Sequence, residues 1–175
     1  MVPAVYLFGK RITGSTVCAA LVCVLFKFDF IHFAQNRLAT IDVYVTFFVI
    51  LMYYFMYRYC TLSFYDTPLV KTLLPLGACG ICMGLGIACK WTGVYAGAGL
   101  AVIFFRQLYC RYEEYRFAKK NPYGRTDGIS HDHVLSSFQP CTTRNILFFL
   151  VFFVALTALI YLLSYLPLRD YFQNG

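Results

Sequence analysis

The stretch from Phe28 to Asp42 carries the side chains of this chain that are best suited to chemistry. It places two carboxylates, Asp29 and Asp42, an imidazole, His32, and a guanidinium, Arg37, between two apolar segments. Keeping ionisable groups near hydrocarbon costs free energy, so such a cluster is a functional-site hypothesis by default. An arginine can bind a phosphate in a bidentate manner, and a carboxylate can bind a sugar hydroxyl or act as a general base. The stretch is therefore typical of a site for a phosphorylated lipid carrier that presents a sugar.

A second charged position, Lys90 beside Trp91, interrupts an otherwise uncharged run from 73 to 105. As one helix this run would be about 50 Å long, against a hydrocarbon core of about 30 Å. We therefore expect two spans that turn at Lys90-Trp91-Thr92-Gly93. If this turn lies on the same face as the stretch 28–42, Lys90 adds a positive point charge for a phosphate.

Simpler roles compete with these assignments. Lys27 and Arg37 can extend toward the membrane surface, and Asp42 can cap or salt-bridge a helix end. Cys79 and Cys82 have the spacing of a redox or metal motif, but they lie in an apolar segment with no second pair nearby. We expect the 8 cysteines to be unpaired packing residues and expect no metal site, including at the sequence His131-Asp132-His133.

The composition predicts what must position these residues. The chain has 175 residues, of which 60% are hydrophobic and only 13% charged, and its mean hydropathy is +0.64. Such values are typical of an all-α, polytopic transmembrane helix bundle, here a single domain over residues 1–175. We expect about five full spans, at 12–30, 43–59, twice within 73–105 and at 146–166, plus a partial first span at 1–9. The glycine pairs Gly80/Gly84 and Gly93/Gly97 predict close helix packing.

The basic residues predict the orientation of these spans. The net charge is +7, but the basic residues fall between apolar runs, which favours membrane topology over nucleic-acid binding. Most of them fall on one side, which the positive-inside rule makes cytoplasmic, including a basic loop at 106–144. Within it, the three-residue spacing of Tyr109, Tyr112 and Tyr115 predicts a helix lying on the membrane surface over 106–120. The stretch 28–42, the Lys90 turn and Asp170 then share the outer face.

Two runs resemble motifs of a known family. The run from Gln35 to Asp42 and the later run from Gly84 to Gly93 are similar, in the same order, to motifs of the protein O-mannosyltransferases. These are dolichyl- or polyprenyl-phosphate-mannose-dependent enzymes of the GT-C glycosyltransferase superfamily, and the short loops look more like the bacterial branch. The resemblance covers essentially the whole chain and implies part of a GT-C membrane module. The positions that carry over are Arg37, Asp42, Lys90, Trp91 and Gly93.

The resemblance implies an activity and its partners. The intact protein would transfer mannose, or a related sugar, from a polyprenyl- or dolichyl-phosphate donor to a Ser or Thr hydroxyl of a protein, with inversion at the anomeric carbon. Arg37, together with Lys90, would hold the donor phosphate, Asp42 would orient Arg37, and Asp29 or His32 would line the acceptor side. We expect the lipid bilayer, the lipid-linked donor and a protein acceptor as partners, no nucleic acid, and no cofactor beyond the donor. The expected location is a bacterial cell membrane rather than the endoplasmic reticulum, with an extracytoplasmic active face.

One departure from the family pattern bears on catalysis. The family's general base is an Asp of an Asp-Glu pair in the first extracytoplasmic loop, and the resemblance finds no counterpart for it here. We therefore expect a fragment that lacks the catalytic acid loop and is inactive by itself. Two other classes stay open on the residues alone. A transporter or flippase fragment would line a substrate path with the same charges, and a non-catalytic membrane scaffold would use them only for anchoring.

Overall fold

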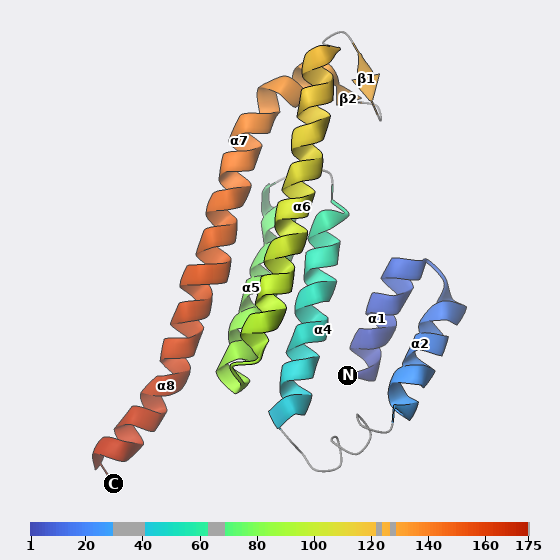
Figure 1. Cartoon of the computed structure of the whole chain (residues 1–175). Coiled ribbons are helices and arrows are strands. Elements are labelled where there is room, and N and C mark those ends of the chain that lie inside the picture. Colours follow the sequence, from blue (N-terminus) through green and yellow to red (C-terminus); the bar gives the residue numbers. More distant parts are fainter. Residues whose placement is uncertain (30–40, 63–68, 122–123, 127–128, 175) are drawn as a thin grey trace.

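The computed structural model describes residues 1–29, 41–62, 69–121, 124–126 and 129–174, and it is an all-α bundle of antiparallel helices (Figure 1). This confirms the predicted fold class. The helices are α1 (Val2–Thr13), α2 (Thr16–Phe28), α4 (Ile41–Cys60), α5 (Leu69–Cys89), α6 (Gly93–Lys120), α7 (His131–Leu150), the π-helix η1 (Val151–Leu156) and α8 (Thr157–Asn174). Two short strands, β1 (Arg125–Thr126) and β2 (Ile129–Ser130), pair in an antiparallel hairpin between α6 and α7.

The first two helices form a short hairpin beside α4 (Figure 1). Gly14 ends α1 in the left-handed conformation, with φ at 68°, and Ser15 caps α2 by accepting from the backbone N–H of Cys18. The sequence predicted a span over 12–30, but the chain turns at Gly14 and Ser15, and the helix begins only at Thr16. Within the described residues α2 has 13 residues, which is shorter than the roughly 20 needed to cross a bilayer.

Four helical segments are long and apolar enough to cross a membrane among the residues that the structure describes: Ile41–Cys60, Val70–Cys89, Gly93–Lys120 and His131–Leu166. The predicted turn at Lys90 is confirmed, because α5 ends at Cys89 and α6 begins at Gly93. The last segment runs through α7, η1 and α8 as one long rod (Figure 1). Its helix begins 15 residues before the predicted span at 146.

The core lies between α4, α5, α6 and the long rod. Met52, Leu76 and Leu100 are fully buried there. Phe149 of α7 stacks on Phe104 of α6, with ring centroids 4.1 Å apart, and on Phe153 at 4.4 Å. This stack joins the rod to α6, so packing as well as lipid solubility holds the spans together.

Glycines allow α5 to approach the π-helical turn closely. A Cβ on Gly80 would lie 2.6 Å from the carbonyl oxygen of Phe152, and one on Gly84 would lie 2.7 Å from the side chain of Ile160. Thr157 donates its hydroxyl to the same Phe152 carbonyl across 3.5 Å. The predicted close packing at the first glycine pair is thus confirmed.

The prediction of a surface helix over 106–120 is wrong, because these residues continue α6 without a break. Tyr115 stacks on Phe138 of α7, with ring centroids 4.5 Å apart and an interplanar angle of 21°. The described residues of 106–144 therefore form the paired ends of α6 and α7 and the β-hairpin. The cytoplasmic location of this region stays a prediction.

Candidate functional site

An ion pair joins the start of α4 to the end of α5. The Nζ atom of Lys90 lies 2.5 Å from Oδ1 of Asp42, and the two side chains are 46% and 44% exposed, respectively. Asp42 occupies the first turn of α4, and its backbone carbonyl accepts from the Thr46 hydroxyl at 2.8 Å. A carboxylate at this end of a helix is favoured by the helix dipole. The Lys90 ammonium is therefore partly solvated, and its position is set by a carboxylate on the first turn of α4.

The turn between α5 and α6 positions Lys90. The backbone N–H of Lys90 donates to the carbonyl of Gly86 at 3.1 Å, and that of Gly93 donates to the carbonyl of Lys90 at 3.0 Å. A Cβ on Gly93 would lie only 3.0 Å from the backbone carbon of Gly86 and the backbone nitrogen of Ile87. The turn can close this tightly because residue 93 has no side chain.

Trp91 extends the site toward α8. Its side chain is 67% exposed, and its ring meets that of Tyr161 edge to face, with centroids 6.0 Å apart. Tyr161 in turn lies 6.2 Å from Tyr165. The site is thus bounded on one side by aromatic rings, which pair well at a boundary between water and hydrocarbon. The contribution of Tyr161 could not be predicted. It lies in an uncharged run, and no sequence pattern in that run indicates which aromatic residue contacts the turn at Trp91.

The structure brings together three of the predicted site residues: Asp42, Lys90 and Trp91. Asp29 follows α2 at the same end of the bundle and is exposed (Figure 1). Arg37 and His32 lie outside the described residues. The predicted orientation of Arg37 by Asp42 is therefore untested, and the partner that the structure gives to Asp42 is Lys90.

The arrangement can bind an anion at a membrane boundary. The Lys90 ammonium is a compact charge with three donors, and one carboxylate contact leaves others for a ligand such as a phosphate. Asp29 adds an exposed carboxylate at this end of the bundle. Among the described residues, no group of three or more His, Cys, Asp or Glu side chains is placed to hold a metal ion. All eight cysteines lie in the described part, and none of them is in a disulfide.

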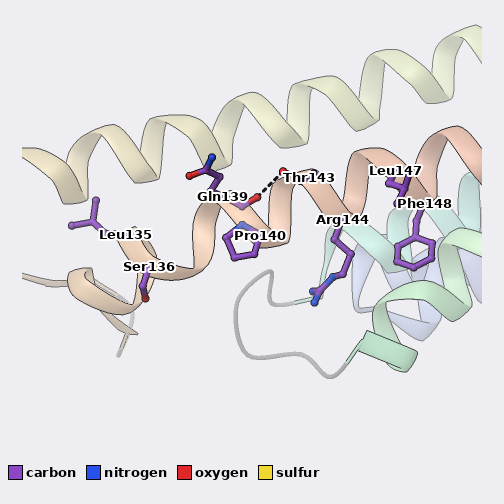
Figure 2. Close-up of a pocket in the computed structure, with 8 residues that line it drawn as sticks. All are labelled: Leu135, Ser136, Gln139, Pro140, Thr143, Arg144, Leu147 and Phe148. Atoms are coloured by element: carbon purple, nitrogen blue, oxygen red, sulfur yellow. Dashed lines mark hydrogen bonds between the residues drawn. The ribbon is translucent and has the colours of Figure 1, made fainter.

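Two hollows elsewhere lack the groups for group-transfer chemistry. A groove of about 700 Å³ follows one face of α7, where it is lined by Leu135, Ser136, Gln139, Pro140, Thr143, Arg144, Leu147 and Phe148 (Figure 2). Arg144 is its one charged lining residue, and no carboxylate accompanies it. A crevice of about 340 Å³ lies between α1, α4 and α6. Neither of these two hollows is lined by an acidic residue.

Comparison with known proteins adds one match. The sequence model of a family described as dolichyl-phosphate-mannose-protein mannosyltransferase matches residues 1–165. No curated protein and no solved structure matches the chain. The matched region includes Asp42, Lys90 and Trp91 and nearly all of the membrane bundle.

Proposed function

The chain belongs to the dolichyl-phosphate-mannose-protein mannosyltransferase family, and from this premise we propose that its Asp42–Lys90 end binds the phosphate of a polyprenyl- or dolichyl-phosphate mannose donor. The reaction is the transfer of mannose from that carrier to a Ser or Thr hydroxyl of a protein. Its long apolar helices make the chain an integral membrane protein, which suits a donor whose carrier is a lipid. Membership of this family favours the transferase over the transporter and the scaffold.

The ion pair between Asp42 and Lys90 is the observation that carries the proposal. It ties together the two motifs whose resemblance suggested a donor site, and it places a cation at the end of two spans. A donor phosphate at this height can accept hydrogen bonds from the Lys90 ammonium, while its chain stays in the bilayer. As the bond to the sugar breaks, negative charge grows on the phosphate, and a fixed cation stabilises that charge.

The remaining roles follow the family motif. Arg37 would share the phosphate with Lys90, and Asp29 or His32 would line the side from which the acceptor hydroxyl approaches. Inversion at the anomeric carbon requires a base on that side of the sugar. We assign that base to no residue of this chain. The site would face the extracytoplasmic side of the membrane.

Trp91 offers a direct test, because it is the only tryptophan of the chain and lies next to Lys90. The purified chain in nonionic detergent is titrated with a short-chain polyprenyl-phosphate mannose while the fluorescence of Trp91 is recorded. We expect a saturable change with the donor and none with the unphosphorylated polyprenol. Lys90→Gln should raise the Kd about tenfold, the loss of one charge-assisted contact.

Lys71→Gln is the matched control, because Lys71 lies in the first turn of α5, whereas Lys90 directly follows the last residue of that helix. It should leave the Kd unchanged. Equal affinity for the donor and the free polyprenol, or equal titrations for the two lysine variants, would contradict a phosphate site at Lys90.

A further inference from the structure

A crevice opens on the opposite half of the bundle from the Asp42–Lys90 pair. It has a volume of about 340 Å³ and is formed by α1, α4 and α6, within the size range of small-ligand sites. Because α4 runs from Asp42 at one end to Cys60 at the other, residues 53–60 place the crevice toward the second end. It is therefore separate from the candidate donor site.

Most of the crevice wall is apolar. Phe8 of α1, Met56 of α4 and Ile103 of α6 line it, together with the rings of Tyr53 and Tyr57. Phe8 also meets Tyr57 with ring centroids 6.3 Å apart, which keeps α1 against α4. Such a wall suits a hydrocarbon chain and offers little to a hydrophilic solute.

The wall becomes polar toward the end of α4. Gln107 donates its side-chain N–H to the carbonyl of Cys60 across 3.4 Å, so these residues lie at the same height. Arg106 lines the crevice beside Gln107 and is exposed, and no acidic residue contributes to the lining. In the part of the chain that the structure describes, Arg106 makes no ion pair.

The height of Arg106 indicates what its charge meets. Gln107 lies at the height of Cys60, the last residue of α4, so the adjacent Arg106 also lies near that end of the span. From there its long side chain can extend the guanidinium toward the lipid headgroups. A cation at that level attracts anionic headgroups.

We propose that this crevice binds one anionic phospholipid, with its phosphate on Arg106 and an acyl chain between α1, α4 and α6. The combination of one cation at the rim, an apolar wall beneath it and no acid in the lining complements such a lipid at both of its ends. The bound lipid would fill the gap between the α1–α2 hairpin and the rest of the bundle and so support their packing. The proposal does not rest on the proposed function, because it concerns other residues at the other end.

Lipid retention tests the proposal. The full chain is extracted from vesicles of phosphatidylcholine and phosphatidylglycerol in nonionic detergent, purified by gel filtration, and its retained lipid is measured by mass spectrometry. We expect phosphatidylglycerol to be enriched over phosphatidylcholine at one site per chain. Arg106→Gln should lower this enrichment about tenfold, whereas Arg116→Gln should not change it, since Arg116 is an exposed arginine of the same helix outside the crevice.

A second variant tests the apolar half. Ile103→Trp adds bulk to an exposed wall position and should abolish retention of phosphatidylglycerol, with unchanged helical circular dichroism. Glycerol phosphate alone should not compete. Equal retention in the Arg106 and Arg116 variants, no preference for phosphatidylglycerol, or competition by glycerol phosphate would overturn the proposal. Because Trp91 lies at the other end, donor titrations by its fluorescence, made in chains that keep Ile103, remain a separate measurement.

Discussion

Lys90 and Asp42 form an ion pair between the end of α5 and the start of α4, although 48 residues separate them in the chain. Both side chains are nearly half exposed, so the pair contributes little to folding, in the range of about 0–1 kcal/mol for exposed pairs. Its consequence is positional, because the carboxylate limits where the ammonium can point. In the proposed site, Asp42 would act on the donor through Lys90.

A double-mutant cycle on donor binding tests this relation. Asp42→Asn should weaken donor binding several-fold, because Lys90 loses its orienting partner, and Lys90→Gln should weaken it more. The double variant should bind like Lys90→Gln alone, since residues that act as a unit are not additive. The free energy of unfolding should change by less than about 1 kcal/mol in each single variant. Additive losses, or tighter binding by Asp42→Asn, would contradict the positioning role.

The sequence predicts the α5–α6 turn because the length of a single helix can be compared with the thickness of the bilayer. A helix from 73 to 105 would be much longer than the bilayer is thick, and Lys90 was the one charge available at a turn. It does not predict that α6 continues past Arg106, because the partner of Tyr115 is Phe138, on a helix that begins later in the chain. Tertiary packing of this kind overrides local amphipathic patterns.

The candidate site was predicted in its location but not in its pairing. Two spans, α4 and α5, separate Asp42 from Lys90. Because an even number of crossings returns the chain to the same face, the sequence predicts that both residues lie on one face. Which cation Asp42 contacts depends on the lateral order of α4 and α5, and no spacing rule reports that. The prediction concerning Arg37 falls outside the described residues.

The contact of α5 with the π-helical turn makes a prediction about two glycines. A Cβ on Gly80 would lie 2.6 Å from the Phe152 carbonyl oxygen, whereas one on Gly77 would lie 3.5 Å from the Phe152 ring. Gly80→Ala should therefore force α5 away from η1 and lower the free energy of unfolding by about 1–3 kcal/mol. Gly77→Ala should be neutral or stabilising by up to about 1 kcal/mol, because alanine favours a helix. Unfolding by dodecyl sulfate in mixed micelles measures both, and equal effects would show that the close approach is unimportant.

A buried polar contact between α4 and α7 makes a third prediction. The Tyr59 hydroxyl donates to the side-chain oxygen of Asn145 at 3.0 Å, and the Asn145 amide donates to the carbonyl of Cys141 at 2.8 Å. Asn145 is only 2% exposed. Tyr59→Phe would leave its oxygen without this donor, so we expect a loss of about 1–3 kcal/mol in the same unfolding assay.

Two further variants distinguish the contribution of the Tyr59 hydrogen bond from that of its aromatic ring. Tyr54→Phe, on the same helix, should have little effect, because among the described residues the Tyr54 hydroxyl makes no hydrogen bond. Adding Asn145→Leu to Tyr59→Phe should cost less than the sum of the two single changes, since neither polar group is then left unpaired. A neutral Tyr59→Phe variant would show that water or lipid replaces the contact.

The orientation of the bundle can be tested with its own cysteines. Cys89 lies next to Lys90, and Cys110 lies beyond Arg106 on α6, so the two thiols mark opposite ends, and both are exposed. Serine replaces Cys18, Cys23 and Cys60 together with either Cys89 or Cys110, which leaves one accessible thiol and the buried Cys79, Cys82 and Cys141 unchanged. If the basic ends of α6 and α7 are cytoplasmic, as the positive-inside rule predicts, a membrane-impermeant maleimide should label Cys89 in intact cells. It should label Cys110 only after permeabilisation. The reverse pattern would place Lys90 in the cytoplasm, where it could serve only a donor on the cytoplasmic face, and labelling of both cysteines from one side would contradict a span by α6.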